Sequence, residues 1–504
     1  MNRIETLARV REREKFWDFI VIGGGATGVG CAVDAASRGF DTLLLEQSDF
    51  GKGTSSRSTK LVHGGVRYLA QGNVSLVREA LKERGILLEN APHIVQKMAF
   101  VVPCYSLLDK FFYGAGLKIY DFLSGKYSFG KSRILSKKET IERLSNVKRE
   151  NLHGGVVYFD GQFDDTRLLI NLAQTACARG AALLNYARVS EITKDENGKI
   201  DGVKFKDAET GEVFAAKGKI VINATGAFCD AIRKLSDENS KNIIAPSQGI
   251  HLVFSKDFLP VETALMIPKT SDGRVLFAIS WHDQTLIGTT DTPVEKAELE
   301  PRALEKEIEF ILQTAKKYLA KPPEREDILS VFVGIRPLVK SENTKNTASL
   351  SRDHTIEIDD ANLLTITGGK WTTYRRMAED VVNQAIRIAG LAEKSCVTES
   401  LKIHGADTAD IRKMIEENPE LAERIHANLP YQKAEIVRAI RDEMAQTVED
   451  ILARRTRALF LNAQAAIELA PEIARVMADE LGKDENWIDE QIKNFTETAR
   501  NYLI

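Results

Sequence analysis

The chain has 504 residues, 43% of them hydrophobic, so it is long enough to bury a large core and to divide into two or three domains. Its 69 basic and 72 acidic side chains leave a net charge of −3, which argues against a protein held to nucleic acid by its overall field. Five scattered cysteines without a CxxC pair suit a reducing compartment and predict neither a metal site nor a disulfide framework.

The sequence predicts no membrane span. Residues 1–19 contain no apolar stretch long enough for a signal peptide, and no later segment reaches the roughly eighteen uninterrupted apolar residues that a span needs. Residues 6–17 mix basic with apolar side chains, a pattern shared by membrane-surface helices and ordinary solvated helices, of which we favour the second. We therefore expect a protein that is cytoplasmic or lies on a membrane surface.

The first predicted unit spans residues 19–46. An apolar run at Phe19–Ile22 leads directly into three glycines, a helix-compatible stretch follows over Ala26–Arg38, and a second apolar run covers Thr42–Leu45. This order predicts a strand, a glycine turn, a helix and a second strand, which together make a βαβ unit at the start of the fold.

The glycines of this unit follow the GxGxxG pattern of a dinucleotide site. Gly23 allows the tight turn, Gly25 lets the backbone approach a pyrophosphate, and Gly28 permits close packing of the helix on the strand. The helix N-terminus offers free N–H groups and a partial positive charge to the phosphates. Glu46, which ends the second strand, is placed to accept hydrogen bonds from a ribose diol and to repel the 2′-phosphate of NADP.

Two later glycine turns favour FAD over NAD. Asn223-Ala224-Thr225-Gly226 closes an apolar run and predicts a second tight approach of the backbone to the dinucleotide. Thr367-Gly368-Gly369-Lys370 also ends an apolar run and opens a helix, so its amides and its lysine are suited to stabilising the negative charge of a reduced flavin. A nicotinamide dehydrogenase has no use for these turns.

Strand-like and helix-like segments alternate along most of the chain. Helices are expected at Arg167–Arg179 and Trp371–Ile388, and strands at Val156–Phe159, Ile220–Asn223, Leu252–Phe254, Val275–Ile279, Leu286–Gly288 and Leu363–Thr367. We predict an α/β fold in which a Rossmann-like FAD-binding domain is interleaved with a substrate domain on a mixed or antiparallel sheet. This oxidoreductase region covers residues 1–395. Strand-like runs then end, so residues 396–504 are predicted to form an all-helical C-terminal domain.

The densest cluster of polar side chains is the loop from Gly53 to Tyr68. Its hydroxyl groups are suited to holding flavin and pyrophosphate, while His63, Arg67 and Tyr68 are too polar and too closely spaced for an ordinary core strand. With this loop the sequence resembles the FAD-dependent glycerol-3-phosphate dehydrogenases of the bacterial aerobic and mitochondrial kind. The resemblance covers nearly the whole chain and continues through residues 159–167, 223–226, 249–251, 287–291, 334–337, 351–354, 368–375 and 448–457.

The resemblance implies an enzyme that oxidises sn-glycerol 3-phosphate to dihydroxyacetone phosphate by hydride transfer to N5 of FAD and passes the electrons to a membrane quinone. It implies peripheral attachment to the inner face of the cell membrane and leaves a homo-oligomer open. The alternatives are a glycerol-3-phosphate oxidase that uses oxygen, a flavin amine or amino-acid oxidase, and a flavin-binding protein without catalytic activity. Oxidases of the family are typically longer by an insertion, which favours quinone here.

A compact phosphate dianion beside a flavin requires several cations. The resemblance implies that Arg67, Tyr68 and Arg352 hold the phosphate, that Arg336 lies nearest the C2 oxygen, and that Lys370 serves the flavin or the substrate. His251 is the first choice for the base that takes the C2 hydroxyl proton, and His63 is the second. The predicted cofactor contacts are Gly23, Gly25, Gly28, Glu46, Thr54, Ser55, Ser56, Gly226, Gly334, Gly368, Gly369, Lys370 and Thr372.

Overall fold

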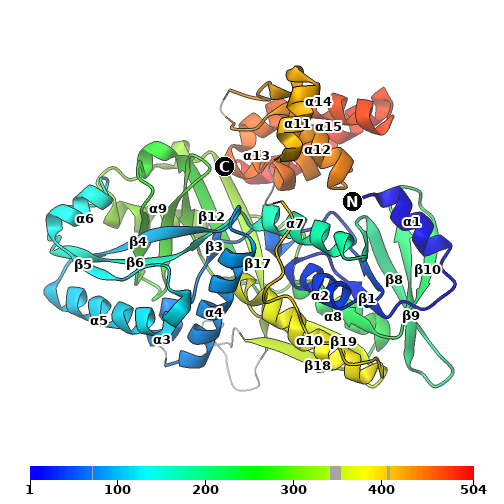
Figure 1. Ribbon diagram of the computed structural model, residues 1–504. Coiled ribbons are helices and arrows are strands. Elements are labelled where there is room, and N and C mark those ends of the chain that lie inside the picture. The colour runs from blue at the N-terminus through cyan, green and yellow to red at the C-terminus, as the bar shows by residue number, and fades with distance from the viewer. Residues whose placement is uncertain (71, 341–352, 406–408, 428) are drawn as a thin grey trace.

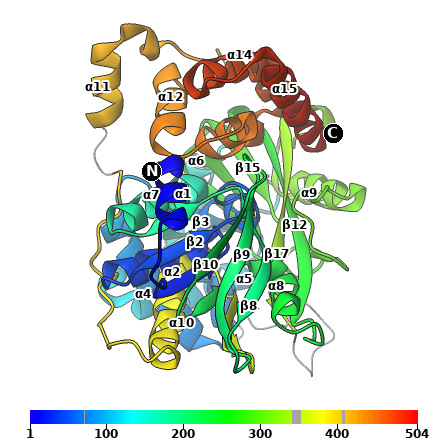
Figure 2. The same ribbon diagram turned by 90° about the vertical axis from the view of Figure 1, so that its right-hand side faces the viewer.

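The computed structural model describes residues 1–70, 72–340, 353–405, 409–427 and 429–504. Its strands form three sheets, and the C-terminal helices lie as a separate lobe on top of them (Figures 1 and 2). This arrangement confirms the predicted fold class, a Rossmann-like α/β domain with a second, mixed sheet and a helical C-terminal part.

The first sheet contains the predicted βαβ unit. Its strand order is β18 (His354–Ile358), β19 (Leu363–Gly368), β11 (Val221–Asn223), β1 (Phe19–Ile22), β2 (Thr42–Leu45) and β7 (Ala182–Leu184). All neighbouring pairs are parallel except β18 with β19. The glycine turn leaves the carboxyl end of β1, near the middle of this sheet, which is where open parallel sheets bind nucleotides.

Side chains of β1 alternate between two cores. Phe19 and Val21 point to one face, which is covered by α2 (Ala26–Ser37), α7 (Asp165–Ala178) and α10 (Tyr374–Ile388). Ile20 and Ile22 point to the other face, which is covered by the antiparallel strands β8 (Ala187–Lys194), β9 (Ile200–Asp207) and β10 (Val213–Lys217) and by α1 (Arg3–Arg11). Burial on both faces explains why this strand is a continuous apolar run.

The second sheet is mostly antiparallel. It runs in the order β16 (Thr292–Pro293), β12 (Ile244–Ser255), β15 (Gln284–Gly288), β14 (Leu276–Trp281), β13 (Ala264–Ile267), β4 (Gln96–Cys104), β6 (Gly154–Gln162) and β3 (Leu61–Val62). Strand β17 (Ser330–Val339) pairs with β12, and β5 (Arg133–Leu135) pairs with β6. The six strands predicted from apolar runs correspond to β6, β11, β12, β14, β15 and β19.

Helices cover both faces of the second sheet. The helices α3 (Val66–Ala70), α4 (Val74–Asn90) and α5 (Leu107–Ser124) lie on one side, and α6 (Lys137–Arg143) and α9 (Glu305–Tyr318) lie on the other (Figure 1). A short helix, α8 (Cys229–Ser236), follows the turn after β11. Among the described residues, no helix is long and apolar enough to cross a membrane.

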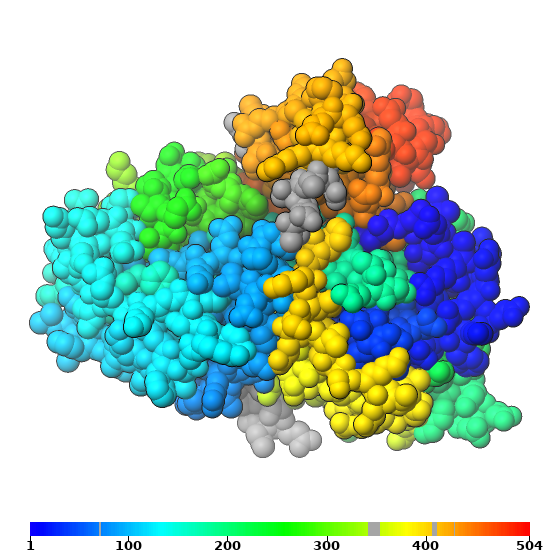
Figure 3. All heavy atoms as spheres, in the orientation of Figure 1, coloured from blue at the N-terminus to red at the C-terminus, as the bar shows by residue number. Residues whose placement is uncertain are grey.

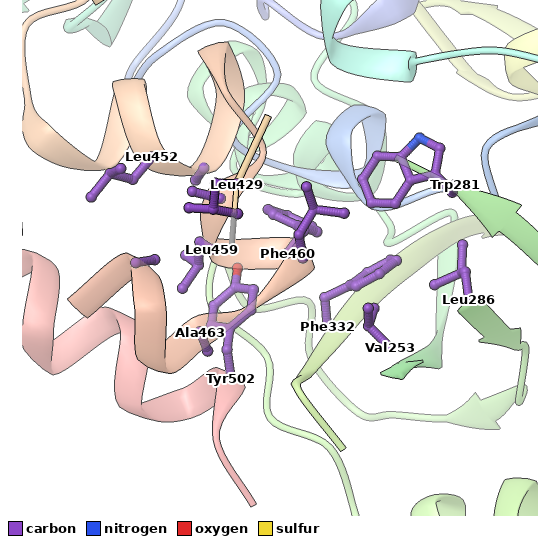
Figure 4. Close-up of a cluster of buried hydrophobic side chains, with 14 of the residues drawn as sticks. Val253, Trp281, Leu286, Phe332, Leu429, Leu452, Leu459, Phe460, Ala463 and Tyr502 are labelled. Atoms are coloured by element: carbon purple, nitrogen blue, oxygen red, sulfur yellow. The ribbon is translucent and has the colours of Figure 1, made fainter. Parts of the chain in front are cut away.

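The C-terminal helices share a core with the second sheet. They are α11 (Ala409–Glu417), α12 (Lys433–Asp442), α13 (Ala458–Leu461), α14 (Ala463–Leu481) and α15 (Glu485–Ala499). Figure 4 shows Phe332 of β17 beside Phe460 of α13, with ring centroids 4.9 Å apart, and Trp281 of β14 in the same cluster. The helical lobe is therefore fixed to the sheet by buried apolar contacts.

Buried ion pairs add a second anchor for this lobe. Arg454 and Arg455 donate to the carboxylate of Asp49 at 2.5 and 2.7 Å, and all three side chains are buried. Burial opposes ionisation of Asp49, but the two guanidinium groups outweigh it and lower the pKa of this carboxyl. Breaking such a pair leaves a buried charge without compensation, so these contacts hold the lobe in one position. The exact boundary at residues 395 and 396 stays a prediction.

Candidate active site

The turn between β1 and α2 is built on glycines. Gly23 has a φ of +111°, and a Cβ at this position would lie 2.7 Å from the carbonyl oxygen of Ala224. A Cβ at Gly28 would collide with the carbonyl oxygen of Gly23. Gly25 is the N-cap of α2 and has no side chain to bind the amides of the first helical turn. The turn therefore presents backbone N–H groups and a positive helix end toward the space in front of it.

Glu46 closes one side of this turn. Its carboxylate accepts hydrogen bonds from the backbone N–H groups of Gly24 at 2.6 Å and Ser48 at 2.8 Å. Burial raises the pKa of Glu46, and the two N–H groups act in the opposite direction. The carboxylate thus has a fixed position at the end of β2, as a ribose-binding residue requires.

A cavity of about 920 Å³ extends from this turn between the two sheets. This volume is within the range of about 300–1,000 Å³ that small-molecule and cofactor sites usually have. The predicted site residues that line it are Gly23, Gly25, Glu46, Thr54, Ser55, His63, Tyr68, Gly226, His251, Gly334, Arg336, Gly368, Gly369, Lys370 and Thr372. The structure therefore brings together residues from seven separate segments of the chain.

Two predicted cofactor residues lie outside the lining of this cavity. Gly28 acts through packing, as described above, and Ser56 is only 2% exposed. The hydroxyl of Ser56 donates to the carbonyl oxygen of Gly53 at 3.3 Å. The carbonyl oxygen of Ser56 accepts from Lys60 Nζ and from Arg457 Nη2, both at 2.7 Å. Ser56 is thus placed to hold the loop in shape rather than to contact a cofactor.

A smaller cavity of about 170 Å³ adjoins the large one. The two share His63, Tyr68 and Arg336 among their lining residues. Arg67 and Arg274 also line the smaller cavity, so three arginines contribute to its lining. Two carboxylates line it as well: Asp160, which is paired with Arg84, and Asp291, which is paired with Arg336. Such a group of cations is suited to a small, multiply charged anion.

Arg336 projects from β17 into the boundary between the two cavities. Its Nη2 donates to the carbonyl oxygen of Thr290 at 2.8 Å and to Thr289 Oγ1 at 3.1 Å, and its Nη1 donates to the carbonyl oxygen of Gln248 at 3.2 Å. Asp291 Oδ1 lies 3.4 Å from Nη1. These contacts fix the plane of the guanidinium group beside the space that both cavities share.

Arg274 was not predicted from the sequence. It follows a tight turn in which its N–H donates to Thr270 Oγ1 at 3.0 Å, and its side chain lies 3.4 Å from Asp272. No motif marks this turn in the sequence. The only available signal was an arginine immediately before a predicted strand, which is too common to indicate a site.

His251 lies on β12, opposite Gly288 of β15 and Phe332 of β17. Its ring stacks on Phe332 with centroids 4.9 Å apart, and its Nε2 lies 2.9 Å from Thr59 Oγ1. Within the described part of the chain, the buried Nδ1 has no hydrogen-bond partner. Burial, together with the positive charges of Lys60 and Arg336, lowers the pKa of His251 well below its ordinary value. The imidazole is therefore neutral near pH 7.

The other described residues that were predicted for the site, Lys370, Tyr68, His63 and Thr372, line the large cavity. Lys370 Nζ is 4.1 Å from the centroid of the Tyr68 ring. The N–H of His63 donates to Thr372 Oγ1 at 3.2 Å, which joins the loop after β3 to the glycine turn after β19. Arg352, predicted to hold the phosphate, lies outside the described residues.

The residues present fit FAD. The glycine turn places the N-terminal end of α2, which is suited to a pyrophosphate, at the cavity, Glu46 lies at the end of β2, and the cavity continues to the second glycine turn at Gly368 and Gly369. Both of these glycines have positive φ values, +80° and +69°, which residues with a side chain rarely adopt, and both line the cavity. Among the described residues, no group of three His, Cys, Asp or Glu side chains is arranged to hold a metal ion.

Comparisons with known proteins agree with this geometry. Residues 18–374 match the FAD-dependent oxidoreductase family, and residues 361–488 match the C-terminal domain of alpha-glycerophosphate oxidase. The chain is 40% identical to a probable mitochondrial glycerol-3-phosphate dehydrogenase of Caenorhabditis elegans, over 100% of this chain and 75% of the relative. It is 39% identical to the mitochondrial glycerol-3-phosphate dehydrogenase of Rattus norvegicus, over 97% of this chain and 73% of the relative.

Solved structures show the same relationship. The glycerol-3-phosphate dehydrogenase of Bacillus halodurans, complexed with FAD, superposes with a TM-score of 0.78 at 29% identity and covers 99% of this chain and 97% of its own. The L-alpha-glycerophosphate oxidase of Mycoplasma pneumoniae, with FAD bound, shares the fold at a TM-score of 0.60 and 16% identity, over 77% of this chain and 98% of its own. The chain therefore belongs to the family of FAD-dependent glycerol-3-phosphate dehydrogenases.

Proposed function

We propose that the protein oxidises sn-glycerol 3-phosphate to dihydroxyacetone phosphate and passes the electrons to a membrane quinone. The observation that supports this substrate is the small cavity lined by Arg67, Arg274 and Arg336, which adjoins the cofactor cavity. A carboxylate substrate, as in amino-acid oxidases, needs only one such group. Three arginines that line a cavity of about 170 Å³ suit a phosphate dianion better, and the two carboxylates of the same lining, Asp160 and Asp291, are each paired with an arginine.

The roles of the residues follow from their positions. Arg67 and Arg274 are proposed to bind the phosphate, with Tyr68 beside them. Arg336, at the boundary of the two cavities, is proposed to face the C2 oxygen and to stabilise the negative charge that develops there. Arg352 is still proposed to bind the phosphate, and Lys370 is still proposed to interact with the flavin or the substrate.

Oxidation of a secondary alcohol removes a hydride from C2 and a proton from its hydroxyl group. FAD, when bound, supplies the two-electron acceptor, and we propose that the hydride goes to N5 of the flavin. His251 is proposed to take the proton, because its imidazole is neutral and lines the same cavity. The stack on Phe332 keeps the ring in one plane, so that the accepting nitrogen has a fixed direction.

Quinone is proposed as the acceptor, and the protein is proposed to lie on the inner face of the cell membrane. An assay with glycerol 3-phosphate that measures reduction of a short-chain quinone and consumption of oxygen in the same sample tests this choice. We expect quinone reduction to account for nearly all turnover. Oxygen consumption that matches turnover when quinone is present would favour the oxidase instead. Reduction of the quinone with glycine or D-amino acids, and not with glycerol 3-phosphate, would refute glycerol 3-phosphate as the substrate.

A further inference from the structure

The outward face of α5 is apolar. Leu108 and Phe122 are 83% and 84% exposed, and Phe111, Phe112 and Ile119 are also largely exposed. Their spacing places them along one side of the helix. Soluble proteins rarely expose a continuous row of large apolar side chains, and such a row usually marks an interaction surface.

The opposite face of α5 is firmly packed. Leu117 and Tyr120 are buried in the core that covers the second sheet. The Tyr120 hydroxyl donates to Asp160 Oδ2 at 2.8 Å and accepts a hydrogen bond from the N–H of Gly64 at 2.8 Å. The helix is therefore held in place by its inner face, and the apolar outer face is a fixed part of the surface.

The apolar row continues onto the neighbouring strand. Ile134 of β5 is 44% exposed, and it lies so close to α5 that a Cβ at Gly114 would be 3.0 Å from Ile134 Cδ1. In Figure 3 the cyan atoms of this region form the left side of the molecule, away from the C-terminal lobe. We call Leu107, Leu108, Phe111, Phe112, Ile119, Phe122 and Ile134 the α5 patch.

Positive charge surrounds the α5 patch. Residues 107–143, from the start of α5 to the end of α6, carry eight basic and four acidic side chains, whereas the whole chain has a net charge of −3. Two of the acidic side chains, Glu139 and Glu142, pair with Arg133 and Lys138. The other two acidic side chains are engaged in local hydrogen bonds, Asp109 with Ser106 and Asp121 with Ser132. Within the described residues, the exposed Lys126 and Lys131 have no carboxylate within ion-pair distance. The region therefore combines exposed aromatic side chains with local positive charge.

We propose that the α5 patch is the surface by which the protein binds a bilayer that contains anionic phospholipid, with α5 lying along the interface. This inference deepens the proposed membrane association and rests on it. Exposed phenylalanines enter the boundary between headgroups and acyl chains, and flanking lysines meet lipid phosphates. A second copy of this chain is a poorer occupant, because it would bring the same positive charges against one another.

The N-terminal segment offers much less apolar surface. Val10 and Trp17 are buried, and the guanidinium group of Arg13 lies 4.0 Å from the centroid of the Trp17 ring. Ile4 and Phe16 remain exposed. Helix α5, in contrast, packs on α3, the helix that carries Arg67 and Tyr68. Attachment through the α5 patch therefore brings the membrane to the side of the molecule on which the proposed phosphate site lies (Figure 1).

The test is co-sedimentation of the full-length protein, with FAD bound, with vesicles of phosphatidylcholine and phosphatidylglycerol or of phosphatidylcholine alone. Phe111→Gln/Phe122→Gln is compared with Ile4→Gln/Phe16→Gln, which makes the same kind of change in the N-terminal segment. Lys126→Gln/Lys131→Gln leaves the apolar row intact and is compared with Lys316→Gln/Lys317→Gln on α9. Bound flavin and circular dichroism confirm that each variant is folded.

We expect Phe111→Gln/Phe122→Gln to lower vesicle binding by about a hundredfold, since each buried phenylalanine contributes roughly tenfold. Lys126→Gln/Lys131→Gln should weaken binding to the anionic vesicles only, and both control variants should bind like the wild type. Loss of binding in Ile4→Gln/Phe16→Gln instead would overturn the proposal, and so would a lower oligomeric state of Phe111→Gln/Phe122→Gln than of the wild type without loss of vesicle binding. Reduction of the flavin by glycerol 3-phosphate is measured without vesicles, so failure of the proposed function shows separately.

Discussion

The guanidinium group of Arg274 lies 3.7 Å from the carboxylate of Asp291, measured from Nη1 to Oδ2. The other carboxylate oxygen, Oδ1, lies 3.4 Å from Arg336. One buried carboxylate thus holds two guanidinium groups at the edge of the small cavity. It keeps both cations near each other at this edge of the cavity.

Arg274→Gln should raise KM for glycerol 3-phosphate by about ten- to a hundredfold, because one charge-assisted hydrogen bond contributes roughly 1.5–3 kcal/mol. The value of kcat should change little if the phosphate is held equally in the ground and transition states. Steady-state kinetics check this. Arg325→Gln, which removes a guanidinium group from the exposed pair with Glu305, is the control and should leave KM unchanged. An unchanged KM in Arg274→Gln would remove this residue from the site.

Arg336→Lys should lower kcat by about tenfold or more while KM changes less, because the charge that Arg336 meets develops only during the reaction. Lysine keeps the charge but cannot reproduce the donors that now reach Thr289 and Thr290. Stopped-flow measurement of flavin reduction across substrate concentrations separates the two effects. A change confined to KM would move Arg336 to the phosphate and contradict its proposed role.

Glu46→Ala should weaken FAD binding by about tenfold or more, because it removes the ribose acceptor and leaves the N–H groups of Gly24 and Ser48 without their partner. The measurement is the FAD retained on gel filtration and the dissociation constant after reconstitution of the apoprotein. Glu212→Ala removes an exposed carboxylate paired with Arg11 and serves as the control. Equal retention in both variants would show that Glu46 does not contact the cofactor.

Local patterns in the sequence predicted the elements that depend on local chemistry. The glycine turn at Gly23, the strand that ends at Glu46 and the second turn at Gly368 all follow from short-range rules for strands, turns and helix ends. Most of the predicted site residues line one cavity in the structure. Their roles came from the resemblance to a family, since no local rule distinguishes Arg336 from any other arginine.

Features that depend on contacts between distant parts of the chain could not be predicted from the sequence. The pairing of β12 with β17 places Phe332 opposite His251, and the stack between these rings depends on a register that no local pattern sets. Arg274 reaches the small cavity only because β14 lies next to β15. The backbone of Ser56 is bound by Arg457 of the C-terminal lobe, a contact between distant parts of the chain that no local pattern predicts. Contacts of this kind depend on tertiary packing.

His251 should make the protein less stable in acid. Its pKa in the folded state is lowered well below the ordinary 6.5, so below pH 6.5 the unfolded chain binds a proton that the folded chain does not. The free energy of unfolding should therefore fall by up to about 1.4 kcal/mol for each pH unit below 6.5, until the folded pKa is reached. His251→Asn removes this contribution. Thermal unfolding of both proteins between about pH 7 and about pH 5.5 checks it. Parallel Tm curves would show that His251 titrates normally.

The most direct test of the proposed activity is an anaerobic absorbance titration of the purified protein with sn-glycerol 3-phosphate. No acceptor is present, so the spectrum of the bound flavin reports only whether this substrate delivers two electrons to it. We predict that the yellow flavin band is bleached by about one equivalent of substrate per FAD, that dihydroxyacetone phosphate is formed, and that glycine and D-amino acids leave the band unchanged. An unchanged spectrum with glycerol 3-phosphate, or bleaching by the amino acids instead, would contradict the account.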